Sequence, residues 1–556
     1  MSRIEKALTI VRNKGVSGAA KMLRRRYTAA PKVQSRRAAA LVRKSMDRAV
    51  LDAQREHKFK NNPLISILMP VYNTDIDMLC CVIESVMAQT YPVWELCICD
   101  ASDGAHASVG DKCREYEAAD SGCRIKYRRL AENKGIAANT NECADMASGE
   151  YLALLDHDDI LHPSALYKVV AEIEKSGADF LYTDELTFSG RIGNVLLTNL
   201  KPDYSPDTLR GNNYICHFTV FSAELFEYAG QFRSEYDGSQ DHDIFLRMTK
   251  KAKKVSHIPE ILYFWRAHKG SVVEDVAVKG YAVDAGIRAV RDNLAEWGQN
   301  AEAVQSDVYP TVYRVRYTLP EEPLVSVIIS DEACDSPQQC ADSLKITEYG
   351  NYEIIFVNGG GSAINECVRQ RAKGSFIMLL DGSAEATEPD WMRELLQYAV
   401  REDAGAVGTA LFNRDGTVNS YFMITGIGSD KTAVPAGRGL NAGDNGYLGR
   451  MGFTQNVNAL NSACLMVSRA KYLEAGGLDE KLSVTYNRID LCLRLRELGY
   501  NNIYTPFAAF RLICAEDDKE KRKNSEETEY FLAEWRGSLR DPYYNVNFRR
   551  DGTYLL

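Results

Sequence analysis

The chain has 556 residues, of which 45% are hydrophobic and 26% charged, and its formal net charge at pH 7 is −9. This length exceeds what one ordinary core holds, so two or three domains are expected, and the composition excludes a disordered chain. No apolar run reaches the roughly 18 residues that a membrane span needs. The cysteines form no CxxC pairs, which favours buried reduced thiols over zinc sites or disulfides.

The first predicted element is a basic arm over residues 1–60, which holds 17 Lys and Arg against 4 Asp and Glu. The rest of the chain therefore carries about −22. Residues 4–27 predict a broken amphipathic helix, which can lie on an anionic membrane surface or pack on the acidic body. The start lacks the pattern of a secretory signal. We therefore expect a cytoplasmic protein, with a peripheral position on the inner face of the cell membrane as an open alternative.

Two later segments open alike, with PLISILMPVYN from Pro63 and PLVSVIISDE from Pro323. Each predicts a buried strand that starts a parallel sheet, and a helical stretch and a second strand follow in each. A third strand and a turn come next, at 147–159 and at 372–384. Alternating strands and helices predict a doubly wound α/β sheet in each copy. We expect domains at 61–315 and 320–556, behind the basic arm.

Within the first copy, the segment LALLDHDDILHP (152–163) places Asp156, His157, Asp158 and Asp159 directly after an apolar strand. Ligands of open α/β sheets bind at the carboxyl ends of strands. Clustered carboxylates on a tight turn repel one another unless a cation neutralises them, and their oxygens suit Mn²⁺ or Mg²⁺. A solvated acidic turn is the structural alternative, but the position after a strand favours a metal site.

A second acidic feature, GSQDHDIFLRM (238–248), opens a predicted helix with Asp241 and Asp243 in its first turn. The helix dipole favours negative charge there, and either aspartate could cap the helix. We assign structural work to Asp243 and chemical work to Asp241. A carboxylate that faces a hydroxyl can take its proton as the oxygen attacks.

An ordered set of motifs now defines a resemblance. The set comprises PVYN (70–73), CDASDG (99–104), NKGIAANTN (133–141), LLDHDD (154–159), KPDYSPD (201–207), SQDHDIFLR (239–247) and LYFWRAHKGS (262–271). Over residues 62–300 the chain resembles the inverting family 2 glycosyltransferases of the GT-A fold. It is most similar to bacterial tandem-domain members that build cell-surface polysaccharides. The fold that this implies is α/β, with two GT-A-like domains (Rossmann-like, with mostly parallel sheets) in tandem behind a basic helical N-terminal arm.

The resemblance also implies roles for single residues. Residues implied to bind the nucleotide-sugar are Pro70, Tyr72, Asn73, Asp100, Asn133, Lys134 and Asp156. Of these, Asp100 would hydrogen-bond the base, and Asp156 would touch the ribose or the metal. The implied metal ligands are Asp158, Asp156 and His268, and Asp241 is the implied general base. His157, Asp159 and His242 are expected to shape the site.

In the second copy the corresponding positions have changed. The alignment places Asn358 opposite Asp100, Ser383 opposite Asp158 and Arg488 opposite Asp241. An Arg side chain stays protonated near neutral pH and cannot act as a base. The second domain is therefore expected to be catalytically degenerate. The alignment is gapped, so misalignment stays open, with Asp479 or Asp490 as other candidate bases.

The leading hypothesis is non-processive transfer of a hexosyl or deoxyhexosyl group, with inversion, from a UDP- or dTDP-linked donor. The expected acceptor is a glycan or a lipid-linked glycan. A bifunctional enzyme with a second centre in 320–556 and a non-catalytic glycan-binding scaffold are the competing hypotheses. A nucleic-acid partner is disfavoured, because the basic arm lacks interleaved aromatic residues and the body is acidic.

Overall fold

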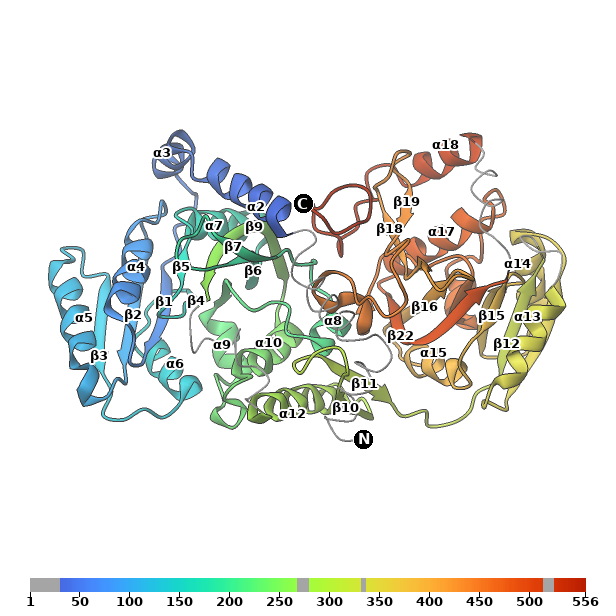
Figure 1. Ribbon diagram of the computed structural model, residues 1–556, viewed down its shortest axis with the longest axis horizontal. Helices are drawn as coiled ribbons and strands as arrows, with labels where there is room; N and C mark the ends of the chain where they lie inside the picture. The colour runs from blue at the N-terminus through green and yellow to red at the C-terminus, as the bar shows by residue number, and fades with distance from the viewer. Residues whose placement is uncertain (1–30, 268–279, 332–336, 514–524) are drawn as a thin grey trace, which may run out of the picture.

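The computed structural model describes residues 31–267, 280–331, 337–513 and 525–556. His268, the predicted third metal ligand, and the predicted helix over 4–27 lie outside these residues. Two nine-stranded sheets, one from each half of the chain, lie side by side along the long axis (Figure 1). Each is a mixed sheet flanked by helices, so the predicted α/β class is confirmed.

The first sheet has the strand order β3-β2-β1-β4-β8-β6-β9-β5, with β7 paired to β6. Its strands are β1 (Ile65–Val71), β2 (Trp94–Asp100), β3 (Ile125–Arg129), β4 (Tyr151–Leu154), β5 (Ile160–Leu161), β6 (Phe180–Phe188), β7 (Val195–Asn199), β8 (Thr219–Ser222) and β9 (Val255–Arg266). β1 to β4 are mutually parallel, whereas β8 runs antiparallel to both β4 and β6. The sheet is therefore less parallel than the strand–helix alternation predicts, because β5, β7 and β8 all pair antiparallel with their neighbours.

The helices of the first half cover both faces of this sheet. They are α4 (Ile76–Met87), α5 (Ala107–Ala119), α6 (Ile136–Ala144), α7 (Ala165–Ser176), α8 (Pro206–Gly211), α9 (Ala223–Ala229), α10 (Gln240–Lys251) and α12 (Gly280–Glu296), with 3-10 turns at Gly104–His106 and Ser234–Tyr236. A two-stranded ribbon, β10 (Ala301–Gln305) and β11 (Tyr313–Tyr317), follows α12 and leads into the second half.

The second sheet has the order β13-β12-β14-β21-β16-β22-β15, which repeats the first sheet without the counterpart of β3. Its strands are β12 (Val325–Ser330), β13 (Tyr352–Val357), β14 (Phe376–Asp381), β15 (Ala384–Ala386), β16 (Ala404–Phe412), β17 (Val418–Ser420), β20 (Gln455–Asn456), β21 (Cys464–Ser468) and β22 (Asn501–Leu512). A separate ribbon joins β18 (Met423–Thr425) and β19 (Ala433–Pro435). The helices are α13 (Pro337–Ser343), α14 (Gly361–Gln370), α15 (Trp391–Ala399), α16 (Arg469–Glu474), α17 (Val484–Glu497) and α18 (Ser525–Glu534), with 3-10 turns at Leu344–Ile346 and Tyr447–Gly452.

Individual hydrogen bonds show that the two halves correspond at three particular positions. In the first half, the Ser66 hydroxyl donates to Glu95 at 2.6 Å and accepts from the Gly149 amide at 2.9 Å. The second half repeats both bonds, at 2.6 and 2.8 Å, with Ser326, Glu353 and Gly374. These pairs lie 260, 258 and 225 positions apart. The duplication inferred from the two strand openings therefore extends to the loop before the third strand.

The two halves share a buried interface. Arg401 in the second half forms an ion pair with Asp207 in the first, with a closest N–O distance of 2.6 Å. The Asn456 amide donates to the same carboxylate at 2.7 Å. All three side chains are almost fully buried. A buried carboxylate needs such partners, because charge without compensation is costly away from water. The halves are thus joined by specific contacts as well as by the connecting ribbon.

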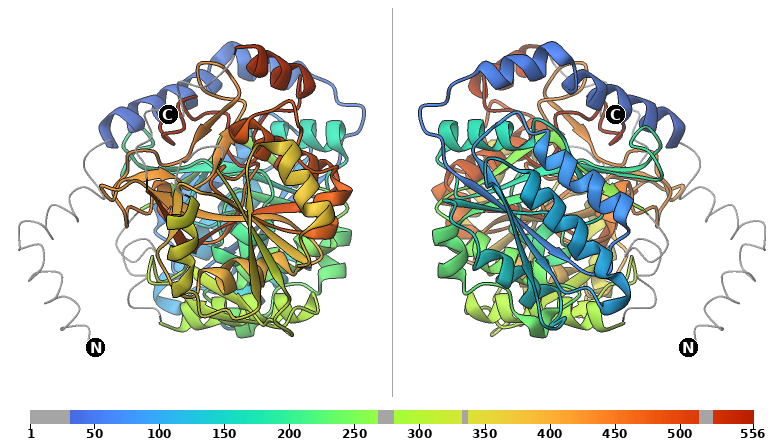
Figure 2. Two further views of the ribbon diagram at one scale, coloured as in Figure 1. Left: turned by 90° about the vertical axis from the view of Figure 1, so that its right-hand side faces the viewer. Right: turned by 90° about the vertical axis from the view of Figure 1, so that its left-hand side faces the viewer.

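The described part of the basic arm forms two helices, α2 (Pro31–Ser45) and α3 (Arg48–Glu56), which cross the top of the molecule (Figures 1 and 2). Ala38 and Val42 of α2 are buried in a cluster that includes residues of β6 and β7. The Arg37 guanidinium donates to the backbone carbonyl of Leu556. No helix in the described ranges is both long and apolar enough to cross a membrane.

His162, beneath the end of α2, supplies a first testable prediction. Burial lowers the pKa of His162 to about 4. Its Nδ1 accepts from the Ser164 amide at 3.1 Å, and its Nε2 lies 3.0 Å from the Ser45 hydroxyl. A ring that accepts at Nδ1 and donates at Nε2 is neutral. The pKa is about 6.5 in the unfolded chain, so the unfolded state binds the proton first as the pH falls.

We therefore expect His162 to destabilise the fold progressively between pH 6.5 and pH 4, by up to about 3 kcal/mol. Urea unfolding of the wild type and of His162→Gln across this range measures the effect. The variant should have lower stability at pH 7.5 but a shallower loss toward pH 4. Parallel curves for the two proteins would contradict the assignment.

Candidate functional site

Several predicted donor-binding residues lie at the carboxyl ends of three neighbouring strands. The parallel register pairs Pro70 on β1 with Cys99 on β2, and Val71 with Asp100. β4 lies on the other side of β1 and ends at Leu154, two residues before Asp156. Pro70, Asp100 and Asp156 are therefore brought to one edge of the sheet, where open α/β sheets bind their ligands.

Asp100 is fully buried, and its carboxylate is already hydrogen-bonded within the protein. One oxygen accepts from the Ser102 amide at 2.8 Å. The other accepts from the Tyr127 hydroxyl at 3.0 Å and from the Arg129 guanidinium at 2.5 Å. In this arrangement Asp100 holds the loop after β2 in place. Its predicted contact with a base stays a prediction, and that contact would require one of these bonds to be shared or exchanged.

The loops beside Asp100 carry the other predicted nucleotide contacts. The Asn73 amide N–H donates to the Ser102 hydroxyl at 2.9 Å, and its side chain exchanges hydrogen bonds with Asp103, which places the PVYN loop against the loop after β2. Tyr72 is 44% exposed, so its ring is open to a ligand. Asn133 accepts from the Gly135 amide at 3.1 Å in the turn before α6.

Lys134, beside Asn133, has an exposed side chain. The same turn is tied to the region before α10, because the Asp237 carboxylate accepts from the Ala137 amide at 3.1 Å. A Cβ at Gly135, whose φ is +95°, would lie 2.1 Å from Asp237. Glycine is therefore required at position 135 both by its conformation and by the close approach of Asp237.

The acidic turn after β4 separates its carboxylates into different environments. Asp159 is fully buried, where it accepts from the Tyr263 hydroxyl at 2.6 Å and from the Arg266 amide at 2.7 Å. Burial, with the charges of Asp156 and Asp158, raises the pKa of Asp159 well above its usual value. The Arg266 side chain donates to the Asp158 carbonyl at 2.7 Å. Asp159 thus fixes the turn against β9, and its role at the site stays a prediction.

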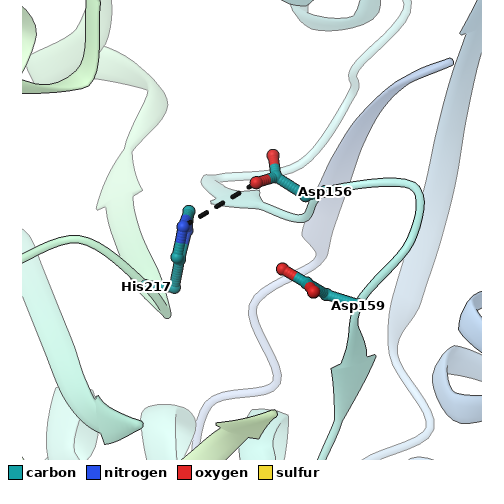
Figure 3. Close-up of side chains that lie close together, drawn as sticks. All are labelled: Asp156, Asp159 and His217. Atoms are coloured by element: carbon teal, nitrogen blue, oxygen red, sulfur yellow. Dashed lines mark ion pairs between the residues drawn. The ribbon is translucent and has the colours of Figure 1, made fainter. Parts of the chain in front are cut away.

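His217 lies directly opposite this turn and was not among the predicted site residues. β4 and β8 are antiparallel, with Ala153 opposite Val220, and continuing this register by three residues brings Asp156 opposite His217. The imidazole Nε2 lies 3.7 Å from an Asp156 oxygen (Figure 3). The ring also stacks on Tyr263, with ring centroids 4.7 Å apart. The sequence gives no sign of this pairing, because a short returning strand such as β8 has no distinctive pattern.

Together, these residues form a candidate metal centre. Asp156, Asp159 and His217 each offer one ligand atom, and the three atoms lie within 4.8 Å of one another. Carboxylate oxygens with one imidazole nitrogen suit Mn²⁺, and such a set also accommodates Mg²⁺ through its oxygens. Asp156 belongs to both the predicted ligand set and this cluster. The predicted roles of Asp158 and His268 as ligands stay predictions.

Asp241, the predicted base, occupies the first turn of α10 and is partly buried. Burial raises the pKa of Asp241, the nearby His217 opposes that rise, and the charge of Asp156 adds to it. These interactions show that Asp241 lies within electrostatic reach of the acidic turn. Two separate acidic features of the sequence therefore face one region of the first half.

The neighbours of Asp241 have structural contacts, as predicted for Asp243. The Asp243 carboxylate forms ion pairs with Arg233 and Arg247 and is buried. The His242 imidazole is buried and lies 2.7 Å from the Leu209 carbonyl. His157, in the acidic turn, shares a hydrogen bond of 2.8 Å with the Thr74 hydroxyl.

Helix α17 of the second half keeps the arginine hydrogen bonds that hold α10 in the first half, but it differs at the position of Asp241. Arg247 donates to Asp243 and to the carbonyls of Ala229 and Gln231. In the second half Arg494 makes the same set of bonds, to Asp490, Ala475 and Gly477. This geometric match supports the alignment of Arg488 with Asp241, two residues before the paired aspartate in each helix.

The edge of the second sheet also lacks the other groups of the candidate metal centre. Asp381 occupies the position in the second sheet that corresponds to Asp156 in the first. Its carboxylate accepts from both the amide and the hydroxyl of Ser383. The Asp381 amide donates to the carbonyl of Ala463, which occupies the position of His217. Arg488 is fully buried. The alternative base Asp490 is engaged by Arg494 and by the Trp535 indole.

Comparison with known proteins agrees with this assignment of the first half. Residues 66–224 match the model of glycosyl transferase family 2. The chain is 34% identical to the uncharacterized protein y4gI of Sinorhizobium fredii, over 88% of this chain and 58% of that protein. It is 30% identical to the O-antigen biosynthesis protein RfbC of Myxococcus xanthus, over 89% of this chain and 41% of that protein.

A shorter relative is covered more fully. The chain is 30% identical to the Bacillus subtilis protein named "Putative glycosyltransferase EpsE", over 36% of this chain and 73% of that protein. The chain therefore belongs to glycosyl transferase family 2, and the family resemblance of the motifs is confirmed. It spans only 58% and 41% of y4gI and RfbC, which continue beyond the matched region.

Proposed function

We propose that the chain is an inverting, metal-dependent glycosyltransferase that moves one sugar from a nucleotide-sugar donor to a glycan acceptor, with its active site in residues 61–315. The observation that carries this proposal is the cluster of Asp156, Asp159 and His217, whose ligand atoms lie within 4.8 Å of one another at the carboxyl ends of the strands. The charges of His217 and Asp156 also act on Asp241, the carboxylate proposed as base. Sugar transfer in surface-polysaccharide synthesis is also what the family and the name of the relative RfbC suggest.

The donor is proposed to bind at the carboxyl ends of β1, β2 and β4. Tyr72 and Asn73 would line one wall of the nucleotide pocket, and Lys134 would approach the diphosphate from the turn before α6. Asp156 and Asp158, with His268, would hold Mn²⁺ or Mg²⁺, and Asp159 and His217 offer an alternative set of ligands with Asp156. When bound, such a cation stabilises the negative charge that the leaving diphosphate gains.

Asp241 is proposed to take the proton of the acceptor hydroxyl. The acceptor oxygen then bonds to the anomeric carbon while the bond from that carbon to the diphosphate breaks, so the configuration inverts in one displacement. The pKa of Asp241 is raised by burial. A carboxylate with a raised pKa is a stronger base than one at its ordinary pKa.

We propose that residues 320–556 form a second GT-A-like domain that has lost its own centre. The replacements at Ser383, Ala463 and Arg488 remove a carboxylate, an imidazole and the base at once. A separate activity that disappears when Arg488 is replaced would instead favour the bifunctional hypothesis.

The proposal is tested by screening nucleotide-sugars with the full chain. Thermal unfolding is recorded with UDP- and dTDP-linked hexoses, with and without manganese, because a ligand that binds the native state raises its apparent stability. Release of the nucleoside diphosphate is then measured for each stabilising donor. Stabilisation by a donor in the presence of manganese, followed by release, supports the proposal. A chain that no donor stabilises, and that releases no nucleotide from any of them, is better described as a scaffold.

The basic arm is proposed to contact an anionic membrane surface, and this gives a further prediction. Because α2 packs on the body and Gln54 of α3 is hydrogen-bonded to Thr90, the informative deletion removes residues 1–30, which contain 8 Lys and Arg against 1 Asp or Glu. Each basic residue near an anionic surface contributes about 1 kcal/mol. We expect the deletion to lower binding to phosphatidylserine-containing liposomes at least about 100-fold while donor turnover survives. Equal liposome binding by the two proteins would remove the membrane contact from the proposal.

A further inference from the structure

A buried lysine stands between the two halves of the molecule. Lys201, in the KPDYSPD segment, is 0% exposed. Its ammonium group forms an ion pair with Glu185 on β6, at 3.0 Å, and donates to the carbonyls of Ile215 and His217. A buried ammonium has three protons to place, and these three acceptors use all of them. The charge is therefore both neutralised and fully hydrogen-bonded.

This ion pair holds the backbone of His217 from both sides. The Lys201 ammonium donates to the His217 carbonyl, and the His217 amide donates to the Glu185 carboxylate at 3.1 Å. The side chain of His217 is 16% exposed and extends from this clamped backbone toward Asp156 (Figure 3). The position of the imidazole at the site thus depends on where Lys201 and Glu185 lie.

The segment that ends the chain reaches into the same network. Asn545 is 3% exposed, and its amide donates to the Lys201 carbonyl at 3.0 Å and to the Asp184 carboxylate at 2.8 Å. The other Asp184 oxygen accepts from the Lys201 amide at 2.8 Å and pairs with His257 at 2.9 Å. Asn545 of the second half therefore holds the Lys201 carbonyl directly, and it holds the Lys201 amide through Asp184.

We infer that the second half of the chain positions His217 at the site of the first half, through Asn545 and Lys201. Asn545 is a positioning residue, since it contacts Lys201 and Asp184 and not the cluster itself. The second half then contributes to the geometry of the active site as well as to the stability of the fold. This inference rests on the proposed function only where turnover is concerned.

A matched control exists on the same interface. Asn456 is also a buried asparagine of the second half, 1% exposed, and its amide donates to a first-half carboxylate, that of Asp207, at 2.7 Å. Its bonds go to Ser205 and Asp207 and not to Lys201. Asn545→Ala and Asn456→Ala therefore remove comparable interface bonds, and only the first reaches the His217 segment.

The first measurement is amide hydrogen exchange in the full-length chain over residues 215–219. Loss of a buried hydrogen bond raises the equilibrium constant for local opening about tenfold. Asn545→Ala should therefore speed amide exchange in this segment by that factor. Asn456→Ala should leave it within about twofold of wild type, because its bonds end at α8. Asn545→Asp, which preserves the side-chain volume but replaces the donating amide, should act in the same direction without leaving a cavity.

The second measurement is steady-state turnover with the donor that wild type uses best. Misplacement of a group at the site lowers kcat more than it weakens donor binding, so Asn545→Ala should lower kcat about tenfold with donor KM within about twofold. Exchange and kcat that match those of Asn456→Ala would overturn the inference. The exchange experiment needs no donor, so a wild-type chain without turnover counts against the proposed function alone.

Discussion

Replacing Asp241 with asparagine is expected to lower the turnover of sugar transfer about 10³-fold. The amide has the size of the carboxylate but cannot accept the proton of the acceptor hydroxyl. Asp241 is within electrostatic reach of His217 and Asp156 but is not itself one of the residues predicted to bind the nucleotide-sugar. The affinity for the donor should therefore stay within a few-fold, which a thermal-shift titration with donor and manganese measures alongside kcat.

Asp243, two positions later in the same helix turn, supplies the control. Its carboxylate is bound by Arg233 and Arg247, so Asp243→Asn removes structural ion pairs and not the proposed base. Breaking a buried pair costs roughly 3–5 kcal/mol of stability. We expect a lower melting temperature for Asp243→Asn, with kcat much less affected where the variant is folded. If Asp241→Asn turns over like wild type, Asp241 is not the base.

The two aspartates also show which parts of the site could be predicted from the sequence. Both stand at the start of a helical pattern, and the sequence supports a chemical and a structural role for either. The structural role predicted for Asp243 agrees with its ion pairs to Arg233 and Arg247, which the structure shows and the sequence does not indicate. The electrostatic interaction of Asp241 with the acidic turn could be expected only from the family resemblance, since some 80 residues separate the two in the sequence.

Strand ends were the most predictable part of the site. An apolar run that stops abruptly at polar residues indicates both a buried strand and the edge where ligands bind, as at Asp100 and Asp156. The sequence does not indicate that β8 inserts antiparallel between β4 and β6, so it could not place His217. Register between strands distant in sequence depends on tertiary packing that no local pattern encodes.

Contacts between the halves could not be predicted for the same reason. Lys201 belongs to a motif, but its burial depends on Glu185, some 16 residues earlier, and on Asn545, more than 300 residues later. A lysine in a loop is normally exposed. Only the fold shows that this one is enclosed and that a residue near the end of the chain fixes it.

Replacing Asp158 with alanine is expected to remove manganese-dependent turnover, lowering kcat/KM about 10³-fold in saturating metal. The cation stabilises charge that develops on the leaving diphosphate, so loss of a ligand acts on the chemical step and on metal affinity together. Turnover is measured against manganese concentration after removal of bound metal with EDTA. Asp111→Ala on α5, whose carboxylate is 73% exposed and pairs with Arg114, is the control for loss of an acidic residue.

The same titration separates two arrangements of the metal centre. If Asp158 is a ligand, Asp158→Ala should raise the manganese concentration for half-maximal turnover at least about tenfold, as expected for loss of one carboxylate ligand. If Asp156, Asp159 and His217 hold the cation alone, Asp156→Ala and His217→Ala should shift the titration while Asp158→Ala leaves it in place. Turnover that survives EDTA undiminished would end the metal proposal, because the charge of the diphosphate would then be stabilised by other groups, with Lys134 of the predicted pocket as one candidate.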